Sequence, residues 1–251
     1  MFICAGRWSR KDLLLTASLD WTARLWHLSR ETCLSKILHH NIVTSIDFHP
    51  TKPDYLMTGS FDQKLRLWHI SQAKVTTVSS APAQITTVAY RPQGDIFVAG
   101  LVDGQCFFYN ADNMSYRTVV KCKNRYGRHN VGRRVTGCQF DKKGELLLVT
   151  TNDSNIRLIR MADYSIIMKF KGTLNQDTGT IRAFFSGGDE RHIICGSQSH
   201  NVFVWRREQQ FDETTADPQL TSKQIRSEQR TVAKALRRKK CVAKPQMFDH
   251  A

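Results

Sequence analysis

Two stretches of this chain have nearly the same sequence motif, and each contains an aspartate. An aspartate side chain is capable of acid–base and metal chemistry. Residues 18–28 read SLDWTARLWHL, and residues 60–70 read SFDQKLRLWHI, with Asp20 and Asp62 at matching positions. Carboxylates gathered in one pocket would suit general acid–base catalysis or the binding of a divalent cation. A carboxylate that recurs once per repeat is expected to stay apart from its counterparts. A structural role within each repeat is therefore the stronger interpretation.

The motif recurs in three weaker copies. We call the residue at the position of Asp20 and Asp62 the anchor, and in these copies it is Asp103, Asp153 or Ser199. The five copies occupy residues 13–28, 55–70, 96–111, 146–161 and 192–206. The large apolar residues six places after the anchors are Trp26, Trp68, Tyr109, Ile159 and Trp205. Constant spacing inside the copies, with variable spacing between them, indicates one structural unit used repeatedly.

Each copy predicts a β-hairpin. An apolar run such as YLMTG meets a polar turn at the anchor, and an alternating run such as KLRLWHI follows. Two more strand-like segments lie between successive copies, as CLSKIL and VTSIDFHP do after the first. Four short strands in about 40–45 residues are the unit expected of a propeller blade.

The residues that carry this pattern resemble the WD-repeat β-propeller family. The resemblance rests on residues 43–70, 125–137 and 146–159 and covers residues 8–205. It implies an all-β fold with about five four-stranded blades of a seven-bladed ring, left incomplete here, and a chain that begins inside a blade. A closed five-bladed ring is the alternative. The propeller domain is expected over residues 1–206, and residues 207–251 form a separate tail.

The family pattern links the turn Asp through a His and a Ser or Thr to the Trp of the same repeat. The first two repeats supply most of this pattern, whereas no His precedes the corresponding strands of the later repeats, which are expected to rely on packing. The residues predicted to have structural roles in the repeats are Ser18, Asp20, Trp26, His39, His40, Ser60, Asp62, Trp68, Asp103, Tyr109, Asp153 and Trp205. The arginines four places after the anchors, Arg24, Arg66 and Arg157, are expected at blade surfaces, where they pair locally.

The sequence offers no sign of catalysis. Its seven cysteines form no C-x-x-C pair, no His/Cys set has metal-ligand spacing, and no P-loop or nucleophile elbow is present. We therefore predict no enzymatic activity, no cofactor and no metal. The absence of a secretory h-region and of a long apolar run favours a soluble, cytoplasmic protein with reduced thiols and no transmembrane segment.

A basic insert lengthens the interval between the third and fourth copies. It contributes Lys121, Lys123, Arg125, Arg128, Arg133 and Arg134. Residues 1–206 contain 27 Lys and Arg against 16 Asp and Glu, so most of the net charge of +15 belongs to the repeats. A basic loop on a rigid scaffold is a candidate interaction element for an acidic protein or an anionic membrane surface. A solvated loop without a partner is the other interpretation.

The tail is polar and basic, with a marginal helix or disorder as its expected state. Thr221 and Gln224 resemble a capping box, which favours the helix. The run Arg237–Lys240 can be interpreted as a nuclear-import or nucleic-acid patch, or simply as a basic tail.

Within the WD-repeat family, the basic insert most resembles that of effectors of the recycling-endosome Rab GTPase. This resemblance implies a non-enzymatic scaffold for protein binding in vesicle trafficking. A GTP-bound Rab GTPase would be its partner, on the cytoplasmic side of endosomal or Golgi membranes. The alternative is a basic propeller that binds RNA or a ribonucleoprotein particle, which the net charge favours.

Overall fold

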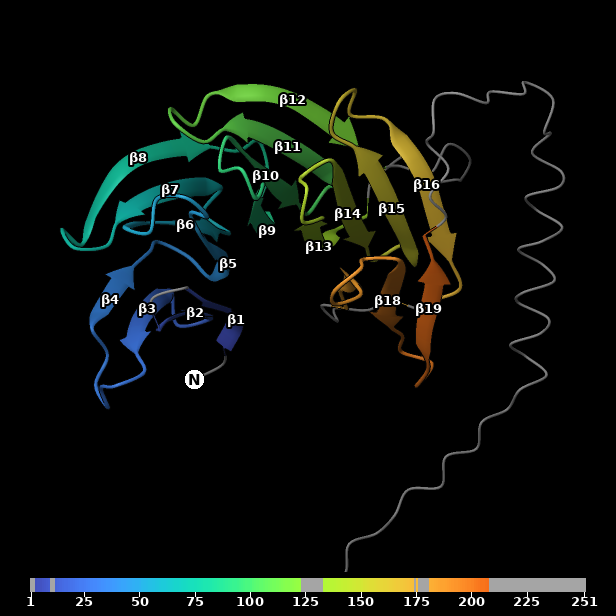
Figure 1. Ribbon diagram of the computed structural model, residues 1–251. Coiled ribbons are helices and arrows are strands. Elements are labelled where there is room, and N and C mark those ends of the chain that lie inside the picture. Colours follow the sequence, from blue (N-terminus) through green and yellow to red (C-terminus); the bar gives the residue numbers. More distant parts are fainter. Residues whose placement is uncertain (1–2, 10–11, 123–132, 174, 176–180, 208–251) are drawn as a thin grey trace, which may run out of the picture. The chain divides into compact units, whose positions relative to one another are not determined.

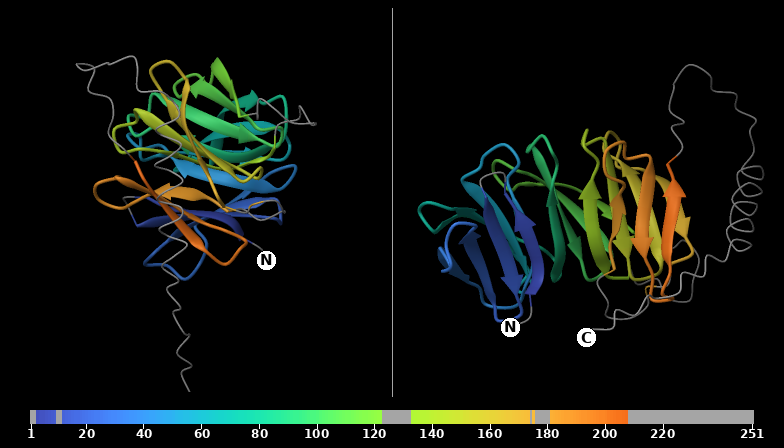
Figure 2. Two further views of the ribbon diagram at one scale, coloured as in Figure 1. Left: turned by 90° about the vertical axis from the view of Figure 1, so that its right-hand side faces the viewer. Right: turned by 60° about the horizontal axis from the view of Figure 1, so that its bottom comes forward.

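The computed structural model describes residues 3–9, 12–122, 133–173, 175 and 181–207. These residues form nineteen β-strands in five antiparallel sheets, and no helix occurs among them (Figure 1). Each sheet is built from strands that are consecutive in the sequence, and the views in Figure 2 show each sheet standing beside the next. The predicted all-β blade architecture is confirmed.

Four sheets contain four strands each. The first consists of β1 (Ile3–Trp8), β2 (Leu13–Ser18), β3 (Thr22–His27) and β4 (Ser35–Leu38). The second consists of β5 (Val43–Phe48), β6 (Tyr55–Ser60), β7 (Lys64–His69) and β8 (Lys74–Ser80). The third consists of β9 (Ile85–Tyr90), β10 (Ile96–Leu101), β11 (Gln105–Asn110) and β12 (Tyr116–Lys121). The fourth consists of β13 (Val135–Phe140), β14 (Leu146–Thr151), β15 (Asn155–Arg160) and β16 (Ile166–Lys171).

The fifth sheet has three strands, β17 (Ala183–Phe185), β18 (His192–Gly196) and β19 (Val202–Arg206). The first sheet is complete, because β1 supplies its first strand. The expectation that the chain begins inside a blade is therefore wrong. The short stretch ICAGRW lacks a strong apolar alternation, so its strand character depends on pairing with β2.

Successive sheets meet along their first strands, because β1 lies against β5, β5 against β9, β9 against β13, and β13 against β17. We call these five the inner strands. The inner strand β9 is buried along its whole length, whereas the outer strand β8 alternates between exposed and half-buried residues. The inner strands are therefore buried even where their residues are polar, as Thr86 and Thr87 are.

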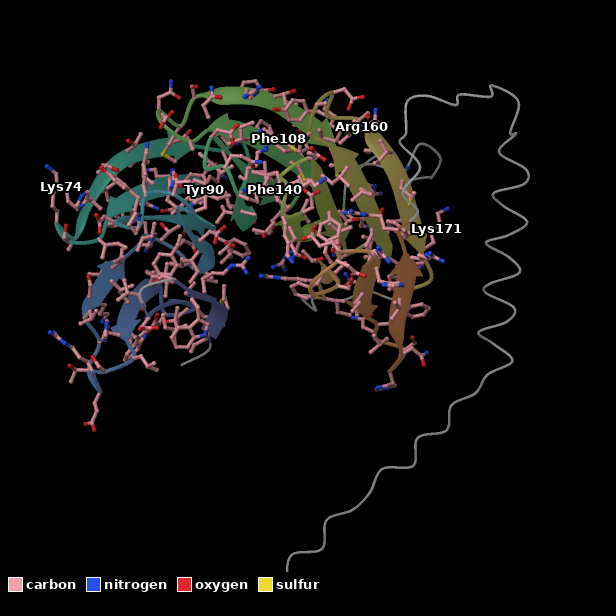
Figure 3. All side chains as sticks on the ribbon, in the orientation of Figure 1. Lys74, Tyr90, Phe108, Phe140, Arg160 and Lys171 are labelled. Atoms are coloured by element: carbon pink, nitrogen blue, oxygen red, sulfur yellow. The ribbon has the colours of Figure 1, made fainter. Side chains whose placement is uncertain are left out.

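The hydrophobic core is divided among the interfaces between sheets. One cluster lies between each pair of neighbouring sheets, and the cluster between the third and fourth includes Phe108 and Phe140. Figure 3 shows these two rings inside, while Lys74, Arg160 and Lys171 point away from the sheets. Each sheet is therefore stabilised chiefly by its neighbours, as expected for a repeat protein.

Two glycines allow close contact between sheets. A Cβ atom on Gly59 of β6 would lie 2.7 Å from Cγ2 of Ile85, in the next inner strand. A Cβ atom on Gly100 of β10 would lie 2.6 Å from both Thr87 Cγ2 and Val135 Cγ1. Both distances are too short for real carbon atoms, so a larger residue would push the inner strands apart.

A threonine at the second position of an inner strand bonds to the next sheet at three interfaces. Thr44 Oγ1 lies 2.7 Å from the carbonyl oxygen of Ile85, and Thr86 Oγ1 lies 2.6 Å from that of Val135. Thr136 Oγ1 lies 2.7 Å from the carbonyl oxygen of Ile181. These buried hydroxyls donate across the interfaces and connect the sheets by directed bonds in addition to apolar contact.

The fifth sheet carries an exposed apolar row. Phe184, Ile194 and Val204 are register neighbours across β17, β18 and β19, and their exposed fractions are 50%, 37% and 52%. At the other interfaces such rows are covered by the next sheet. The predicted tail, residues 207–251, lies outside the described residues apart from Arg207, so the predictions for its structure and its Arg237–Lys240 run stay predictions.

Candidate interaction surface

The turn that carries Asp62 shows the local chemistry of the repeat. Asp62 accepts hydrogen bonds from the backbone N–H of Lys64 at 3.0 Å and from Nη2 of Arg66 at 2.6 Å. Burial opposes ionisation of this carboxyl group. The bonds from Arg66 and the Lys64 N–H outweigh burial and lower the pKa of Asp62. The carboxylate is thus used to hold the β6–β7 turn and the buried Arg66.

A second network joins two side chains of this sheet to His39, which lies in the connection between β4 and β5. His39 Nε2 lies 2.8 Å from Thr58 Oγ1, and Trp68 Nε1 donates to the same hydroxyl at 3.0 Å. Burial is the main cause that lowers the pKa of His39 to about 4, with the nearby Arg66 charge adding to it. His39 is therefore neutral at pH 7. His40 is exposed and does not take part in this network.

The hydroxyl that bonds Trp68 belongs to Thr58 and not to Ser60. Ser60 Oγ instead donates to the carbonyl oxygen of Ile42 at 2.9 Å and accepts from the Asp62 N–H at 3.3 Å. The sequence pattern pointed to Ser60 because it lies closer to Asp62. A threonine four places before the anchor, present in LLLTAS and YLMTGS, is the signal that identifies the correct residue.

The first sheet repeats most of this arrangement. Asp20 accepts from Thr22 Oγ1 at 2.6 Å and from Arg24 Nη2 at 2.9 Å. Trp26 Nε1 donates to Thr16 Oγ1 at 3.0 Å, which parallels the bond between Trp68 and Thr58. Ser18 Oγ accepts from the Asp20 N–H at 3.3 Å, as Ser60 does from Asp62.

The fourth sheet contains the most buried version of the ion pair. Arg157 Nη2 lies 2.7 Å from Asp153 Oδ2, and the Arg157 side chain is fully buried. Burial opposes ionisation of Asp153, but the hydrogen bonds from Arg157 and Thr151 lower its pKa. The expected local pairing of the repeated arginines occurs in the structure. The expected surface position is wrong for Arg66 and Arg157, because both side chains are buried.

The remaining repeat residues serve turns and packing. Asp103 accepts from the backbone N–H of Gln105 at 3.2 Å. The Tyr109 ring stacks on Phe97 with centroids 5.1 Å apart, and burial raises the pKa of Tyr109 to about 12. Trp205 lies 5.7 Å from the Phe170 ring of the preceding sheet. These contacts are local to one repeat or to one interface.

The four turn aspartates therefore do not share a pocket, because each lies in a different sheet and bonds to groups of its own turn. Among the described residues, no group of three or more His, Cys, Asp or Glu side chains is arranged to hold a metal ion. The turn residues stabilise the fold, and the interaction surface must be sought elsewhere.

The structure describes three of the six basic insert residues. Lys121 ends β12 and is exposed, while Arg133 and Arg134 directly precede β13. Lys123, Arg125 and Arg128 lie outside the described residues. The guanidinium carbon of Arg134 is 6.0 Å from the centroid of the Phe61 ring, next to Asp62. The downstream end of the insert therefore lies at the end of the inner strands where the Asp62 turn also lies.

Four-stranded antiparallel sheets, joined along their inner strands and closed by Asp turns with a Thr–Trp bond, define blades of the WD-repeat β-propeller type. Residues 31–69 match the family model described as WD domain, G-beta repeat. Within the described residues, no helix is long and apolar enough to cross a lipid bilayer.

The chain is similar to two proteins named for their WD repeats and to a third relative. It is 38% identical over 201 residues to WD repeat-containing protein 44 of Xenopus laevis, covering 79% of this chain and 22% of that protein. It is 32% identical over 205 residues to an uncharacterized WD repeat-containing protein of Schizosaccharomyces pombe, covering 79% and 34%. It is 29% identical over 224 residues to 2-deoxy-glucose resistant protein 2 of Saccharomyces cerevisiae, covering 81% and 26%. The chain thus spans about a fifth to a third of the length of these relatives.

Proposed function

We propose that this chain is a non-enzymatic scaffold in membrane traffic that binds a protein partner. Its GTP-dependent partner would be a Rab GTPase of recycling endosomes, bound at the surface of endosomal or Golgi membranes. WD-repeat proteins generally act as scaffolds for protein interaction. The Rab GTPase and the membrane location rest on the resemblance of the basic insert to Rab effectors.

The observation that carries the scaffold proposal is the position of the basic insert. It leads into β13, an inner strand that is packed on both sides by other sheets. Arg133 is exposed there, and Arg134 is held against Phe61. Charged side chains that a rigid framework supports, as Arg133 and Arg134 are beside β13, lose less conformational freedom on binding than those of a free basic segment.

The test is a pull-down with purified Rab GTPase loaded with a non-hydrolysable GTP analogue or with GDP. We expect retention with the GTP analogue only, and a weaker signal for the Arg133→Glu variant. Lys143→Glu is the matched control, because exposed Lys143 lies in the β13–β14 turn, at the opposite end of β13. Equal retention of both nucleotide forms, or equal loss in both variants, would contradict the proposal.

The net charge of +11 over residues 1–206 favours one alternative, the binding of RNA or a ribonucleoprotein particle. Filter binding of a single-stranded RNA across a salt series separates the two functions. RNA retention that falls steeply with salt, together with no binding of either Rab form, would favour the alternative.

A further inference from the structure

The fifth sheet has one strand fewer than the other four. Its third strand, β19, forms its edge among the described residues, whereas the third strand of every other sheet pairs with a fourth (Figure 1). The N–H of Arg207 donates to the carbonyl oxygen of Arg191, as the N–H of Met161 does to that of Glu145 in the fourth sheet. β19 is therefore the counterpart of β15, which pairs with β16.

The backbone of β19 presents hydrogen-bonding groups at this edge. In the fourth sheet, the N–H of Arg160 donates to the carbonyl oxygen of Ser165, just before β16. Every second residue of an antiparallel strand bonds to the same neighbouring strand, so alternate residues of β15 face β16. The residues at the corresponding positions of β19 are Val202, Val204 and Arg206. Their N–H and C=O groups face the outer edge, where no strand of the described part of the chain pairs with them.

Large apolar side chains accompany these backbone groups. Val202 and Val204 are 70% and 52% exposed, and Val204 ends the exposed apolar row of this sheet. On the other face of β19, Phe203 and Trp205 are half-buried, and their rings stack with centroids 5.7 Å apart. An exposed apolar edge strand is a template for pairing with another chain.

The outer strands of the other sheets are edges too, but each carries at least one lysine. These lysines are Lys36 of β4, Lys74 of β8, Lys121 of β12, and Lys169 and Lys171 of β16. Lysine protects an edge strand, because a strand that pairs with it must accommodate the charge. β19 reads VFVWR, so its one charged residue is the last, Arg206. This edge lacks the protection that the other four have.

The sequence that follows β19 does not resemble the other outer strands. In the other sheets, four to seven residues separate the third strand from the fourth. The same spacing after β19 leads to residues 211–217, FDETTAD, in which Phe211 is the one large apolar residue. Aspartate is disfavoured in strands, and the four outer strands contain no acidic residue. A separate protein segment is therefore the better match for this edge.

The fourth sheet shows which chemistry such a segment needs. Two apolar residues of β16, Met168 and Phe170, lie opposite the β15 residues that correspond to the two valines of β19. Before β16, Asp163 Oδ2 lies 3.9 Å from Nη1 of Arg160, the counterpart of Arg206. Arg206 itself is exposed and forms no ion pair with a described acidic residue. A matching segment has an acidic residue and, five places later, the first of two apolar residues separated by one.

We propose that the edge of β19 binds an extended segment of a partner protein as a fourth, antiparallel strand. The segment places its acidic residue beside Arg206 and its two apolar residues opposite Val204 and Val202. In this mode of binding, backbone hydrogen bonds provide affinity and alternate side chains provide specificity. The proposal goes beyond the scaffold function and depends neither on a Rab GTPase nor on the basic insert.

The test uses the full chain and a fluorescein-labelled peptide with the sequence of residues 162–171, ADYSIIMKFK. This sequence pairs with the counterpart of β19 in the fourth sheet, so we expect saturable binding by fluorescence anisotropy. Absence of saturable binding would overturn the proposal.

Backbone methylation of the peptide tests the pairing itself. The N–H of the peptide's phenylalanine corresponds to that of Phe170, which faces the neighbouring strand, so its methylation should weaken binding about tenfold or more. The N–H of the preceding lysine faces away, and its methylation should change binding by less than about twofold. Equal loss for both peptides would show that the peptide does not bind as a strand and would overturn the proposal.

Variants test the edge. Val204→Pro removes an edge-facing N–H, at a place where an edge strand tolerates proline, and should weaken peptide binding about tenfold. Val78→Pro is its control, since Val78 is exposed on the outer strand β8, and it should bind as the wild type does. Arg206→Glu should also weaken binding, and it serves if Val204→Pro does not fold. Its control, Arg117→Glu, changes an exposed arginine of β12. Equal loss in a variant and its control contradicts the proposal.

The mass of the chain in solution distinguishes a partner segment from a second copy. Size-exclusion chromatography with light scattering should give the same mass for the wild type and for Val204→Pro. A wild-type dimer that Val204→Pro dissociates, without binding of the peptide, would assign this edge to a second copy and overturn the proposal.

Discussion

Thr86 of β9 donates a hydrogen bond to the carbonyl oxygen of Val135 in β13, and the two oxygen atoms are 2.6 Å apart. The same hydroxyl lies 2.9 Å from the carbonyl oxygen of Gly100 in its own sheet. One threonine thus connects a sheet internally and to its neighbour. Equivalent positions are held by Thr44 and Thr136.

The first prediction concerns this bridge. Thr86→Val keeps the shape of the side chain and removes the donor, so we expect it to reduce the free energy of unfolding by about 1–2 kcal/mol. Thr118→Val, at a half-buried position of the outer strand β12, is the control and should change stability by less than about 0.5 kcal/mol. Urea denaturation followed by tryptophan fluorescence measures both. Equal effects would show that the bridge adds no stability.

The second prediction concerns the hydroxyl shared by His39 and Trp68. Thr58→Val leaves the polar ring nitrogens of both residues without this partner. Thr16→Val removes the partner of Trp26 and a long bond of 3.4 Å to the carbonyl oxygen of Arg24, but it affects no histidine. We expect a loss of about 2–3 kcal/mol for Thr58→Val and about 1 kcal/mol for Thr16→Val. Thermal unfolding monitored by circular dichroism tests the order, and a larger effect at Thr16 would contradict it.

The third prediction is a pH dependence that arises from His39. Because the folded protein lowers the pKa of His39 from 6.5 to about 4, the unfolded chain takes up a proton first as the pH falls. The stability linked to neutral His39 is therefore complete above pH 6.5 and is lost as the pH falls toward 4. Between pH 7 and pH 5 the loss is about 2 kcal/mol.

This pH effect is measured by urea denaturation at several pH values. The His39→Gln variant should show a shallower decline in stability than the wild type, and exposed His40→Gln should not. Because the lowered pKa values of Asp62 and Asp153 also add an acid-dependent loss, the comparison between variants is what isolates His39. Identical slopes for His39→Gln and the wild type would rule out its role.

The fourth prediction compares two versions of one ion pair. Asp153→Asn leaves the fully buried Arg157 without its carboxylate and should cost about 3–5 kcal/mol. Asp20→Asn affects a more exposed pair and should cost about 1 kcal/mol or less. The double variant Asp153→Asn with Arg157→Met should recover part of the loss, because it removes the unpaired charge. Chemical denaturation of the three variants gives the comparison.

The fifth prediction concerns thiol reactivity. Cys106 and Cys122 are buried with their Sγ atoms 4.0 Å apart, and the contact with Cys106, together with burial, raises the pKa of Cys122. Cys33 is half-buried. Brief alkylation of the native protein with iodoacetamide at pH 8 should therefore modify Cys33 before Cys122, as measured by peptide mass spectrometry. Faster modification of Cys122 would show that the interface between the third and fourth sheets opens readily.

The sequence predicted the hairpins well because each one is local. Asp62, Arg66 and Trp68 lie within seven residues, so their pattern is visible without knowledge of the fold. The bridging threonines were not predicted, because threonine is common in strands and their acceptors lie more than forty residues away.

The threonine bridges also bear on how such a protein can change in evolution. The donor belongs to one sheet and its acceptor to the next, so adding or deleting part of a sheet breaks a bond at the boundary. A gene segment that encodes one whole sheet carries its own donor and its own acceptor. Duplication of that segment keeps a threonine bond at each boundary between sheets. The blade is therefore the smallest segment that can be added or lost without breaking these bonds.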